Sequence, residues 1–315
     1  MNTLCLFNPR AGRFGRHLLE KAFASRGDAG RTFWGTVTYQ SLAEPGGRDW
    51  PARLGGIGRV AVFGGDGTVH HTIQALAFKE QELCVFPAGT ANDLTCAIGL
   101  SLELDRNLEL FEKGKTVAYD TITVNGRHVI TGGGFGLGFQ AAASANTLRS
   151  GPFGGLFRKF LRAKIYLVTL AWHGLFSPPP RVGYTLTLDG AVSEGKTQSI
   201  LFCNQALMGK RVLIAPGTSP IDGRFHFVRF LNRNAAGILN TLGQVKSGNP
   251  MAEAMLARAE VREARLVFSE PVPAYGDGEE FAPRTDWELR CHPGAIRLRV
   301  PDAFGGRTAF GAQGA

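Results

Sequence analysis

The chain has 315 residues, of which 44% are hydrophobic, and its 35 lysines and arginines exceed its 26 acids to give a formal net charge of +9. This length predicts about two domains, and this hydrophobic fraction excludes a largely disordered chain. The excess positive charge favours an anionic partner, such as a nucleotide, a nucleic acid or an acidic membrane surface, without choosing among them.

The sequence also argues against secreted and membrane-spanning proteins. The first residues, MNTLCLFNPR, lack the basic leader and long apolar core of a secretion signal, and the longest apolar run, 165–176, is too short to span a bilayer. The five cysteines are scattered without a Cys-x-x-Cys pair, which predicts buried free thiols in a reducing compartment. We therefore expect a cytoplasmic protein.

The first third of the chain alternates strand and helix patterns. Apolar strands are predicted at 3–9, 59–65 and 83–89, and helices at 16–25, 68–78 and 91–100. Uninterrupted apolar strands that alternate with helices indicate a parallel sheet covered on both faces. Ligands of such sheets bind at the carboxyl ends of the strands, which here follow Phe7, Phe63 and Phe86.

From about Tyr119 the pattern changes to alternating segments rich in β-branched and aromatic residues, separated by glycine or asparagine turns. This pattern predicts an antiparallel sandwich, with strands in the segments 120–134, 181–190, 197–204, 223–231, 263–270 and 295–301. A helix that mixes basic and large apolar residues is expected near 153–176, where SPPPR ends it. The expected fold class is therefore α/β plus all-β, an N-terminal α/β nucleotide-binding domain followed by a C-terminal antiparallel β-sandwich.

Two turns that combine glycine with an acid, FGGDGT and PAGTAND, follow neighbouring strands. Glycine lets backbone N–H groups approach phosphate oxygens, and the helix that follows directs its positive end at the anion. An acid beside phosphates is repulsive unless a cation lies between them, so Asp66 predicts a Mg²⁺ contact. A third polar turn, NPRAG, follows the first strand. Each turn alone is typical of an ordinary strand-to-helix connection with a capping residue, but the three together favour a nucleotide site.

In this order and spacing, NPRAG, FGGDGT and PAGTANDL resemble the catalytic domain of the diacylglycerol kinase family, which includes bacterial lipid kinases, sphingosine kinases and ceramide kinases. The resemblance continues through YD, GGGFGLGFQA, CNQALMGKRVLIAPGTSPIDG and GDGEE, and so spans nearly the whole chain. It implies a nucleotide-binding domain over 1–118, a β-sandwich lipid domain over 119–295 with the helical insert near 153–176, and ATP in the cleft between them. The segment 296–315 is expected to return to the first domain.

The resemblance also implies roles for individual residues. Those expected to contact ATP are Asn8, Pro9, Gly12, Thr38, Gly64, Gly65, Asp66, Gly67, Thr68, Gly89, Thr90 and Asn92. Asp277 is the expected general base, with Glu279 supporting it or binding metal, and Asp66 belongs to the same catalytic set.

A second metal site is implied at Asp222, which matches a family Mg²⁺ site completed by the backbone carbonyls of Ser219 and Arg224. From the residues alone, GDGE around Asp277 is typical of a hairpin turn, and Asp222 is typical of a turn acid before a strand. Both alternatives stay open.

Two departures from the family pattern bear on function. His70 and His71 stand where the family usually has an Asn-Glu pair, and Gln140 stands where many members carry an acid near the lipid headgroup. Adjacent histidines on a helix face different directions, so no zinc site is expected there.

The sequence thus predicts an enzyme that uses ATP and Mg²⁺ to phosphorylate the hydroxyl of a neutral membrane lipid, such as diacylglycerol or a ceramide or sphingoid-type lipid. We expect it to be peripheral on the inner face of the membrane and to dock on anionic lipid through the 153–176 helix, whose basic residues are Arg158, Lys159, Arg162 and Lys164. The alternative for that helix is packing on the sandwich with its basic side chains snorkelling to water.

Other functions also stay open. One is an NAD-kinase-like enzyme with a soluble substrate, and another is a catalytically impaired nucleotide sensor, which the two histidines favour. No nucleic-acid partner is expected, and whether the chain forms a homodimer stays open.

Overall fold

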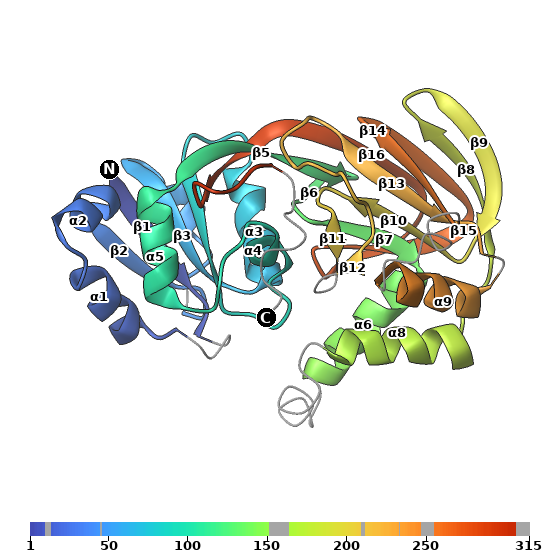
Figure 1. Ribbon diagram of the computed structural model, residues 1–315, viewed down its shortest axis with the longest axis horizontal. Coiled ribbons are helices and arrows are strands. Elements are labelled where there is room, and N and C mark those ends of the chain that lie inside the picture. Colours follow the sequence, from blue (N-terminus) through green and yellow to red (C-terminus); the bar gives the residue numbers. More distant parts are fainter. Residues whose placement is uncertain are drawn as a thin grey trace. The chain divides into compact units, whose positions relative to one another are not determined.

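The computed structural model describes residues 1–9, 14–44, 46–150, 164–208, 212–232, 234–246 and 255–306. They form two compact units, one made of Met1–Asp120 and the residues from Pro293 on, the other of Thr121–His292 (Figure 1). The chain leaves the first unit in β5 (Lys115–Val124) and returns to it in β16 (Glu279–Val300).

The first unit is built on a parallel sheet in the order β2-β1-β3-β4-β16. Its strands are β2 (Val37–Ser41), β1 (Asn2–Phe7), β3 (Ile57–Gly64), β4 (Glu82–Pro87) and the end of β16. The apolar runs predicted as strands are β1, β3 and β4. Two further strands complete the sheet. β2 pairs with β1 at one edge, and the end of β16 pairs with β4 at the other, where Arg297 lies opposite Glu82.

Helices cover both faces of this sheet. On one face lie α1 (Arg16–Ala24), α2 (Asp28–Trp34) and α5 (Leu104–Lys113), and on the other lie α3 (Asp66–Leu76) and α4 (Asp93–Ala97) (Figure 1). A short 3₁₀ helix, η2 (Trp50–Arg53), precedes β3. Phe63 and Phe86 stack in the core under α1, α2 and α5, with ring centroids 4.2 Å apart. The predicted parallel sheet with two covered faces is confirmed.

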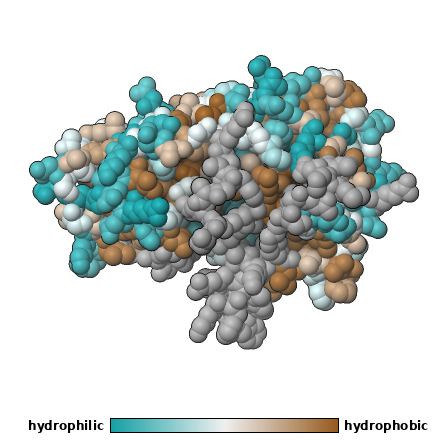
Figure 2. Space-filling view, viewed as in Figure 1, coloured by the Kyte–Doolittle hydropathy of each residue, from teal (hydrophilic) through white to brown (hydrophobic). Residues whose placement is uncertain are grey.

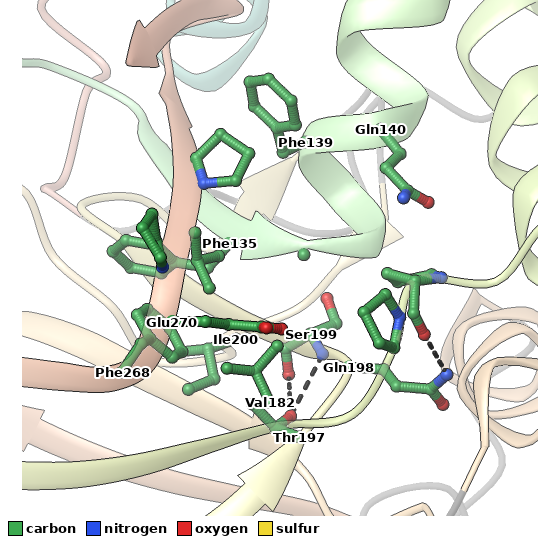
Figure 3. Close-up of a pocket in the computed structure, with 16 residues that line it drawn as sticks. Phe135, Phe139, Gln140, Val182, Thr197, Gln198, Ser199, Ile200, Phe268 and Glu270 are labelled. Atoms are coloured by element: carbon green, nitrogen blue, oxygen red, sulfur yellow. Dashed lines mark hydrogen bonds between the residues drawn. The ribbon is translucent and has the colours of Figure 1, made fainter. Parts of the chain in front are cut away.

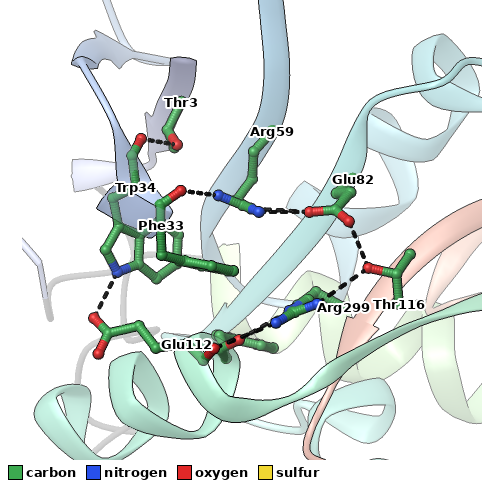
Figure 4. A network of polar contacts seen from close by, with 9 residues as sticks. Thr3, Phe33, Trp34, Arg59, Glu82, Glu112, Thr116 and Arg299 are labelled. Atoms are coloured by element: carbon green, nitrogen blue, oxygen red, sulfur yellow. Dashed lines mark hydrogen bonds and ion pairs between the residues drawn. The ribbon is translucent and has the colours of Figure 1, made fainter. Parts of the chain in front are cut away.

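A buried polar network attaches the end of β16 to the first unit (Figure 4). Arg59 donates to Glu82 Oε2 from Nε at 3.1 Å and from Nη2 at 2.6 Å, and Thr116 Oγ1 donates to Glu82 Oε1 at 2.6 Å. Arg299 of β16 donates to Thr116 Oγ1 at 3.4 Å and to the carbonyl oxygen of Phe111 at 2.8 Å. Burial alone would raise the pKa of Glu82, but the bonds from Thr116 and Arg59 outweigh it and lower that pKa.

The second unit is an antiparallel β-sandwich, as the alternating pattern predicted. One layer contains β14 (Leu256–Val261), β13 (Phe225–Phe230), β10 (Ser199–Cys203), β7 (Gly132–Gly136) and the second half of β15 (Glu263–Gly276). The other contains β9 (Ala191–Thr197), β8 (Val182–Leu188), the first half of β15, β16, β5 and β6 (Arg127–Val129). Register shifts between Val267, Val272 and Ala274 mark the place where the β15–β16 pair passes between layers.

Both layers contribute to one core, in which Phe135 of the first layer meets Trp287 of the second at 5.4 Å between ring centroids. Three helices, α6 (Leu137–Ser150), α8 (Lys164–Phe176) and α9 (Ala235–Lys246), pack on the outer face of the β7-β10-β13 layer (Figure 1). β11 (Leu207–Met208) pairs antiparallel with β12 (Val212–Leu213) in a separate two-stranded sheet.

The helix expected near 153–176 is present as α8 from Lys164 on. Arg158, Lys159 and Arg162 lie outside the described residues. Within the described ranges, no helix is both long enough and apolar enough to cross a bilayer.

The predicted buried thiols are confirmed for four cysteines, whereas Cys96 is exposed.

Candidate active site

A carboxylate joins the two glycine turns of the first unit. Asp66 is the first residue of α3, and its Oδ2 accepts the N–H of Asn92 while its Oδ1 accepts the N–H of Asp93, both at 2.8 Å. These N–H groups begin α4 and have no partner within that helix. The acid of the first turn therefore caps the helix of the second.

The glycines of the two turns pack directly against each other. A Cβ built on Gly89 would lie 2.5 Å from the Cα of Gly65, and a Cβ on Gly64 would lie 2.4 Å from the Cβ of Thr68. The sequence argued for glycine from phosphate approach alone. The structure adds a second reason, because a side chain on Gly89 would force the turns apart and one on Gly64 would clash with Thr68.

Asn92 closes the second turn on itself. Its backbone is left-handed with φ at 55°, its Oδ1 accepts the N–H of Gly89 at 2.8 Å, and its Nδ2 donates to the carbonyl oxygen of Gly89 at 3.0 Å. The side chain predicted to contact the nucleotide thus has a structural task, and its nucleotide contact stays a prediction.

Asn8 joins these turns at the same end of the sheet. It follows Phe7, which pairs with Phe63, and its Nδ2 donates to Thr68 Oγ1 at 3.4 Å. We call Asn8, Asp66, Thr68, Gly89 and Asn92 the strand-end cluster. Its members come from three turns that are far apart in the sequence.

The other residues predicted to bind the nucleotide differ in burial and in their position along the sheet. Gly67 is in the first turn of α3, Thr90 is half-buried in the second glycine turn, and Pro9 is exposed directly after Asn8. Gly12 lies outside the described residues. Thr38 pairs with Leu4 and is exposed three residues before β2 ends, so the structure does not bring it into the cluster.

The two histidines of α3 face different directions, as predicted. His70 is fully buried and His71 is exposed. Among the residues that the structure describes, no group of three or more His, Cys, Asp or Glu side chains could hold a metal ion.

Asp277 lies in the second unit, in the two-residue turn that joins β15 to β16. Its φ of 53° and the φ of 85° at Gly278 are those that an Asp-Gly hairpin turn requires. The backbone therefore confirms the hairpin turn that GDGE predicted. Glu279 follows as the first residue of β16 and is half-buried.

The carboxylate of Asp277 is unlike that of an ordinary turn residue, because the residue is only 6% exposed. Its Oδ1 accepts the N–H and the hydroxyl of Thr131 at 2.8 and 2.6 Å, and its Oδ2 accepts the N–H of Ile130 at 3.0 Å. Three donors from the β6–β7 connection therefore fix its orientation.

The second unit also contains an apolar pocket of about 210 Å³ (Figure 3). Aromatic, aliphatic and proline side chains form most of its wall, among them Phe135, Phe139, Val182, Ile200, Phe268 and Pro273. Gln140 and Gln198 also line it, and the Oε1 atom of each is buried without a hydrogen-bond partner. The family comparison of the sequence singled out Gln140, but nothing in the sequence predicted that Gln198 lines the same pocket.

The predicted metal residue Asp222 is exposed, and its Oδ1 accepts the N–H of Arg224 at 3.0 Å. Partial burial raises the pKa of Asp222, and the negative charge of Glu260 adds to the rise. Ser219, whose carbonyl was expected to share the metal, is buried in the same loop. Glu260 also forms an ion pair with Arg224 at 4.0 Å, and the described side chains supply no group of three or more ligands for a cation.

Each unit matches the model of a known domain. Residues 2–124 match the diacylglycerol kinase catalytic domain, and residues 160–300 match the YegS C-terminal NAD kinase beta sandwich-like domain. The chain belongs to the diacylglycerol kinase family of lipid kinases. Membership in this family makes the chain a kinase and implies the use of ATP.

Similar proteins carry names consistent with this membership. The chain is 27% identical over 251 residues to a probable lipid kinase YegS-like of Shewanella frigidimarina, covering 78% of this chain and 77% of that protein. It is 27% identical over 299 residues to a probable lipid kinase YegS-like of Pseudomonas aeruginosa, covering 91% of each. A putative diacylglycerol kinase from Bacillus anthracis has a similar structure, with a TM-score of 0.76 and 18% identity over 96% of this chain and 98% of that one. The structural likeness supports the fold alone.

Proposed function

We propose that this kinase transfers the γ-phosphate of ATP to the hydroxyl of a neutral membrane lipid, diacylglycerol or a ceramide or sphingoid-type lipid, with Asp277 as general base. The observation that carries the proposal is the carboxylate of Asp277, which is buried, accepts hydrogen bonds from three donors and belongs to a turn residue whose backbone is left-handed. A hairpin needs no buried acid at this position, whereas a catalytic base needs a fixed orientation.

The strand-end cluster is the proposed nucleotide site. It supplies the hydroxyl of Thr68 and the side-chain amide of Asn8. The turns that contain it add the N–H groups at the start of α3 and the bare backbone of Gly64, Gly65 and Gly89. Backbone N–H groups and a helix N-terminus favour phosphate oxygens. Mg²⁺ bound with ATP would neutralise phosphate charge, and Asp66 is the residue that would contact it, directly or through water.

Asp277 would accept the proton of the lipid hydroxyl as the new phosphorus–oxygen bond forms. In such transfers catalysis depends mainly on positioning and charge neutralisation, so a well-oriented carboxylate suffices. The donors of Ile130 and Thr131 provide that orientation. Glu279 would support Asp277 or contact the metal from the start of β16.

The apolar pocket supports a lipid acceptor. Pro273 of its wall and Asp277 belong to one continuous stretch of chain, and four extended residues span about 13 Å. An amphiphile could therefore place its tail among Phe135, Phe139 and Ile200. The buried oxygens of Gln140 and Gln198 would accept hydrogen bonds from O–H or N–H groups near its head.

We also propose that Asp222 holds a second Mg²⁺ with the carbonyls of Ser219 and Arg224. Asp222 is exposed in the loop that also contains Ser219 and Arg224, and its Oδ1 already accepts the N–H of Arg224 at 3.0 Å, so the three proposed ligands belong to one turn. Mg²⁺ should then raise the melting temperature of the wild type more than that of Asp222→Asn. An equal rise of the melting temperature in the two proteins would contradict a Mg²⁺ site at Asp222.

The test of the proposed function is a screen with radiolabelled ATP and Mg²⁺ against diacylglycerol, ceramide, a sphingoid base and phosphatidylglycerol in mixed micelles. We expect label in the organic extract with at least one of them. Label that appears instead in NADP when NAD is added would favour a soluble-substrate kinase. ATP binding without transfer to any acceptor would favour a sensor.

A further inference from the structure

One face of α8 is apolar and exposed. Val168, Trp172, Leu175 and Phe176 are 48%, 60%, 58% and 69% exposed, and their spacing of four, three and one residues places them on one side of the helix. The rings of Trp172 and Phe176 lie 4.9 Å apart between centroids. We call these four residues the α8 face. Brown apolar surface is visible in Figure 2 in the region where Figure 1 shows α8.

The opposite side of α8 is packed, so the orientation of the helix is fixed. Thr169 Oγ1 donates to the carbonyl oxygen of Ala141 at 2.9 Å, and Leu170 is only 8% exposed. Gly174 lies so close to α9 that an added Cβ would be 2.3 Å from a methyl carbon of Leu239. The α8 face is therefore presented to the outside by a helix that α6 and α9 hold in place.

The sequence around this helix is strongly basic. No Asp or Glu occurs between Asp120 and Asp189, and this stretch contains Arg127, Arg149, Arg158, Lys159, Arg162, Lys164 and Arg181. These seven residues account for most of the net charge of +9. A basic stretch that includes an apolar, aromatic helix face is complementary to an anionic bilayer surface.

We propose that the α8 face docks on the surface of an anionic bilayer. Tryptophan and phenylalanine side chains favour the membrane interface, and the basic residues of this stretch of sequence are attracted to anionic headgroups. A second copy of the chain carries the same net charge of +9, so charge repulsion disfavours a dimer through this face.

Docking there would also bring the lipid pocket close to the bilayer. Thr169 of α8 bonds to Ala141, the residue after Gln140 of the pocket wall, and Pro179 and Pro180 follow α8 and line the same pocket. This step builds on the proposed lipid acceptor, because only an enzyme with such a substrate gains from the arrangement.

Tryptophan fluorescence can report on the α8 face alone. The chain has four tryptophans, and Trp34, Trp50 and Trp287 are only 2%, 5% and 1% exposed, against 60% for Trp172. Vesicles of phosphatidylcholine mixed with phosphatidylglycerol should shift the emission to shorter wavelength and protect it from acrylamide quenching. Trp172→Phe should abolish both changes.

The binding itself is measured by co-sedimentation with the same vesicles. The double variant Leu175→Ser with Phe176→Ser should bind at least about tenfold more weakly, because two large apolar side chains no longer leave water. Val192→Ser is the matched control, since Val192 is an equally exposed apolar residue on β9 and should leave binding unchanged.

Two outcomes would overturn the proposal. One is full binding by the double variant without protection of Trp172. The other is protection that needs no vesicles and grows with protein concentration, which would identify a second copy as the partner. Transfer to a short-chain lipid in solution separates this proposal from the proposed function. The double variant should keep that activity. Absence of transfer to the short-chain lipid by the wild type would contradict the proposed kinase reaction and not the docking surface.

Discussion

The carboxylate of Asp66 accepts the backbone N–H of Asn92 at 2.8 Å and so connects two turns that lie 26 residues apart in the chain. With the matching bond to Asp93, it satisfies two N–H groups at the start of α4. Two neighbouring glycine turns thus form one unit, in which the acid of the first fixes the backbone of the second. The glycines of both allow the close approach that this bond requires.

Asp66→Asn should therefore lower the free energy of unfolding as well as activity. The amide keeps one acceptor but turns a donor toward an N–H group, and loss of such a cap costs about 1–2 kcal/mol. The measurement is denaturant unfolding, with Asp105→Asn in the exposed first turn of α5 as the matched control. If Asp66 also contacts Mg²⁺, the variant should need more Mg²⁺ for half-maximal rate. Unfolding identical to the wild type would show that the cap contributes nothing.

Gly89→Ala should weaken ATP binding through the geometry of the turns. The new methyl group would lie 2.5 Å from the Cα of Gly65, so the two turns must separate. We expect a lower melting temperature and at least about tenfold weaker ATP affinity by calorimetry, the equivalent of about 1.4 kcal/mol. Gly55→Ala is the control, because a Cβ there meets nothing within 4 Å and its φ is ordinary. Normal ATP affinity in Gly89→Ala would show that close packing of the turns is dispensable.

Thr131→Val should reduce turnover by fixing Asp277 less firmly. The hydroxyl of Thr131 donates to Asp277 Oδ1 at 2.6 Å, and valine keeps the shape but removes this donor. We expect kcat to fall by about tenfold to a hundredfold while the KM for ATP stays nearly constant, and Thr131→Ser should restore most of the rate. An unchanged kcat would mean that the hydroxyl has no part in positioning the base.

Glu82 should make the stability of the protein fall at acid pH. Its pKa is lowered in the folded protein by the bonds from Thr116 and Arg59, which outweigh the effect of burial. This contribution to stability is therefore fully present above the unfolded pKa and is lost as pH falls through the folded one. Glu82→Gln should flatten the acid limb of a plot of unfolding free energy against pH.

Arg59→Met tests the same ion pair from its other side. Removing one partner of a buried pair leaves an uncompensated charge and costs about 3–5 kcal/mol, so this variant should unfold at much lower denaturant concentration near neutral pH. Arg265→Met breaks the exposed pair with Asp286 and is the control, with an expected cost below about 1 kcal/mol. Equal stability of the two variants would contradict a structural role for the network.

Local patterns in the sequence were sufficient to predict much of the fold. The buried strands β1, β3 and β4, the helices α1 and α3, and the change to an antiparallel sandwich near Tyr119 follow from apolar runs, periodicity and turn residues. The pairing of strands that are distant in the chain did not follow from local patterns. β16 runs unbroken from Glu279 to Val300, whereas the pattern predicted only its last residues as a strand.

In the candidate site, too, local features could be predicted from the sequence and contacts between distant residues could not. The turns, their glycines and the hairpin at Asp277 are local features, so motif and turn chemistry predicted them. The contacts of Asp277 with Thr131, 146 residues away, and of Asp66 with Asn92 depend on how strands meet in space, which no short motif records. The presence of both Gln140 and Gln198 in the wall of one pocket is of the same kind.

The most direct test of the central claim compares the wild type with Asp277→Asn in transfer of radiolabel from ATP to the preferred lipid, alongside calorimetric ATP binding by both. The account predicts that the variant folds and binds ATP with near-normal affinity but loses essentially all transfer. A variant that still phosphorylates the lipid at a rate close to the wild type would contradict it.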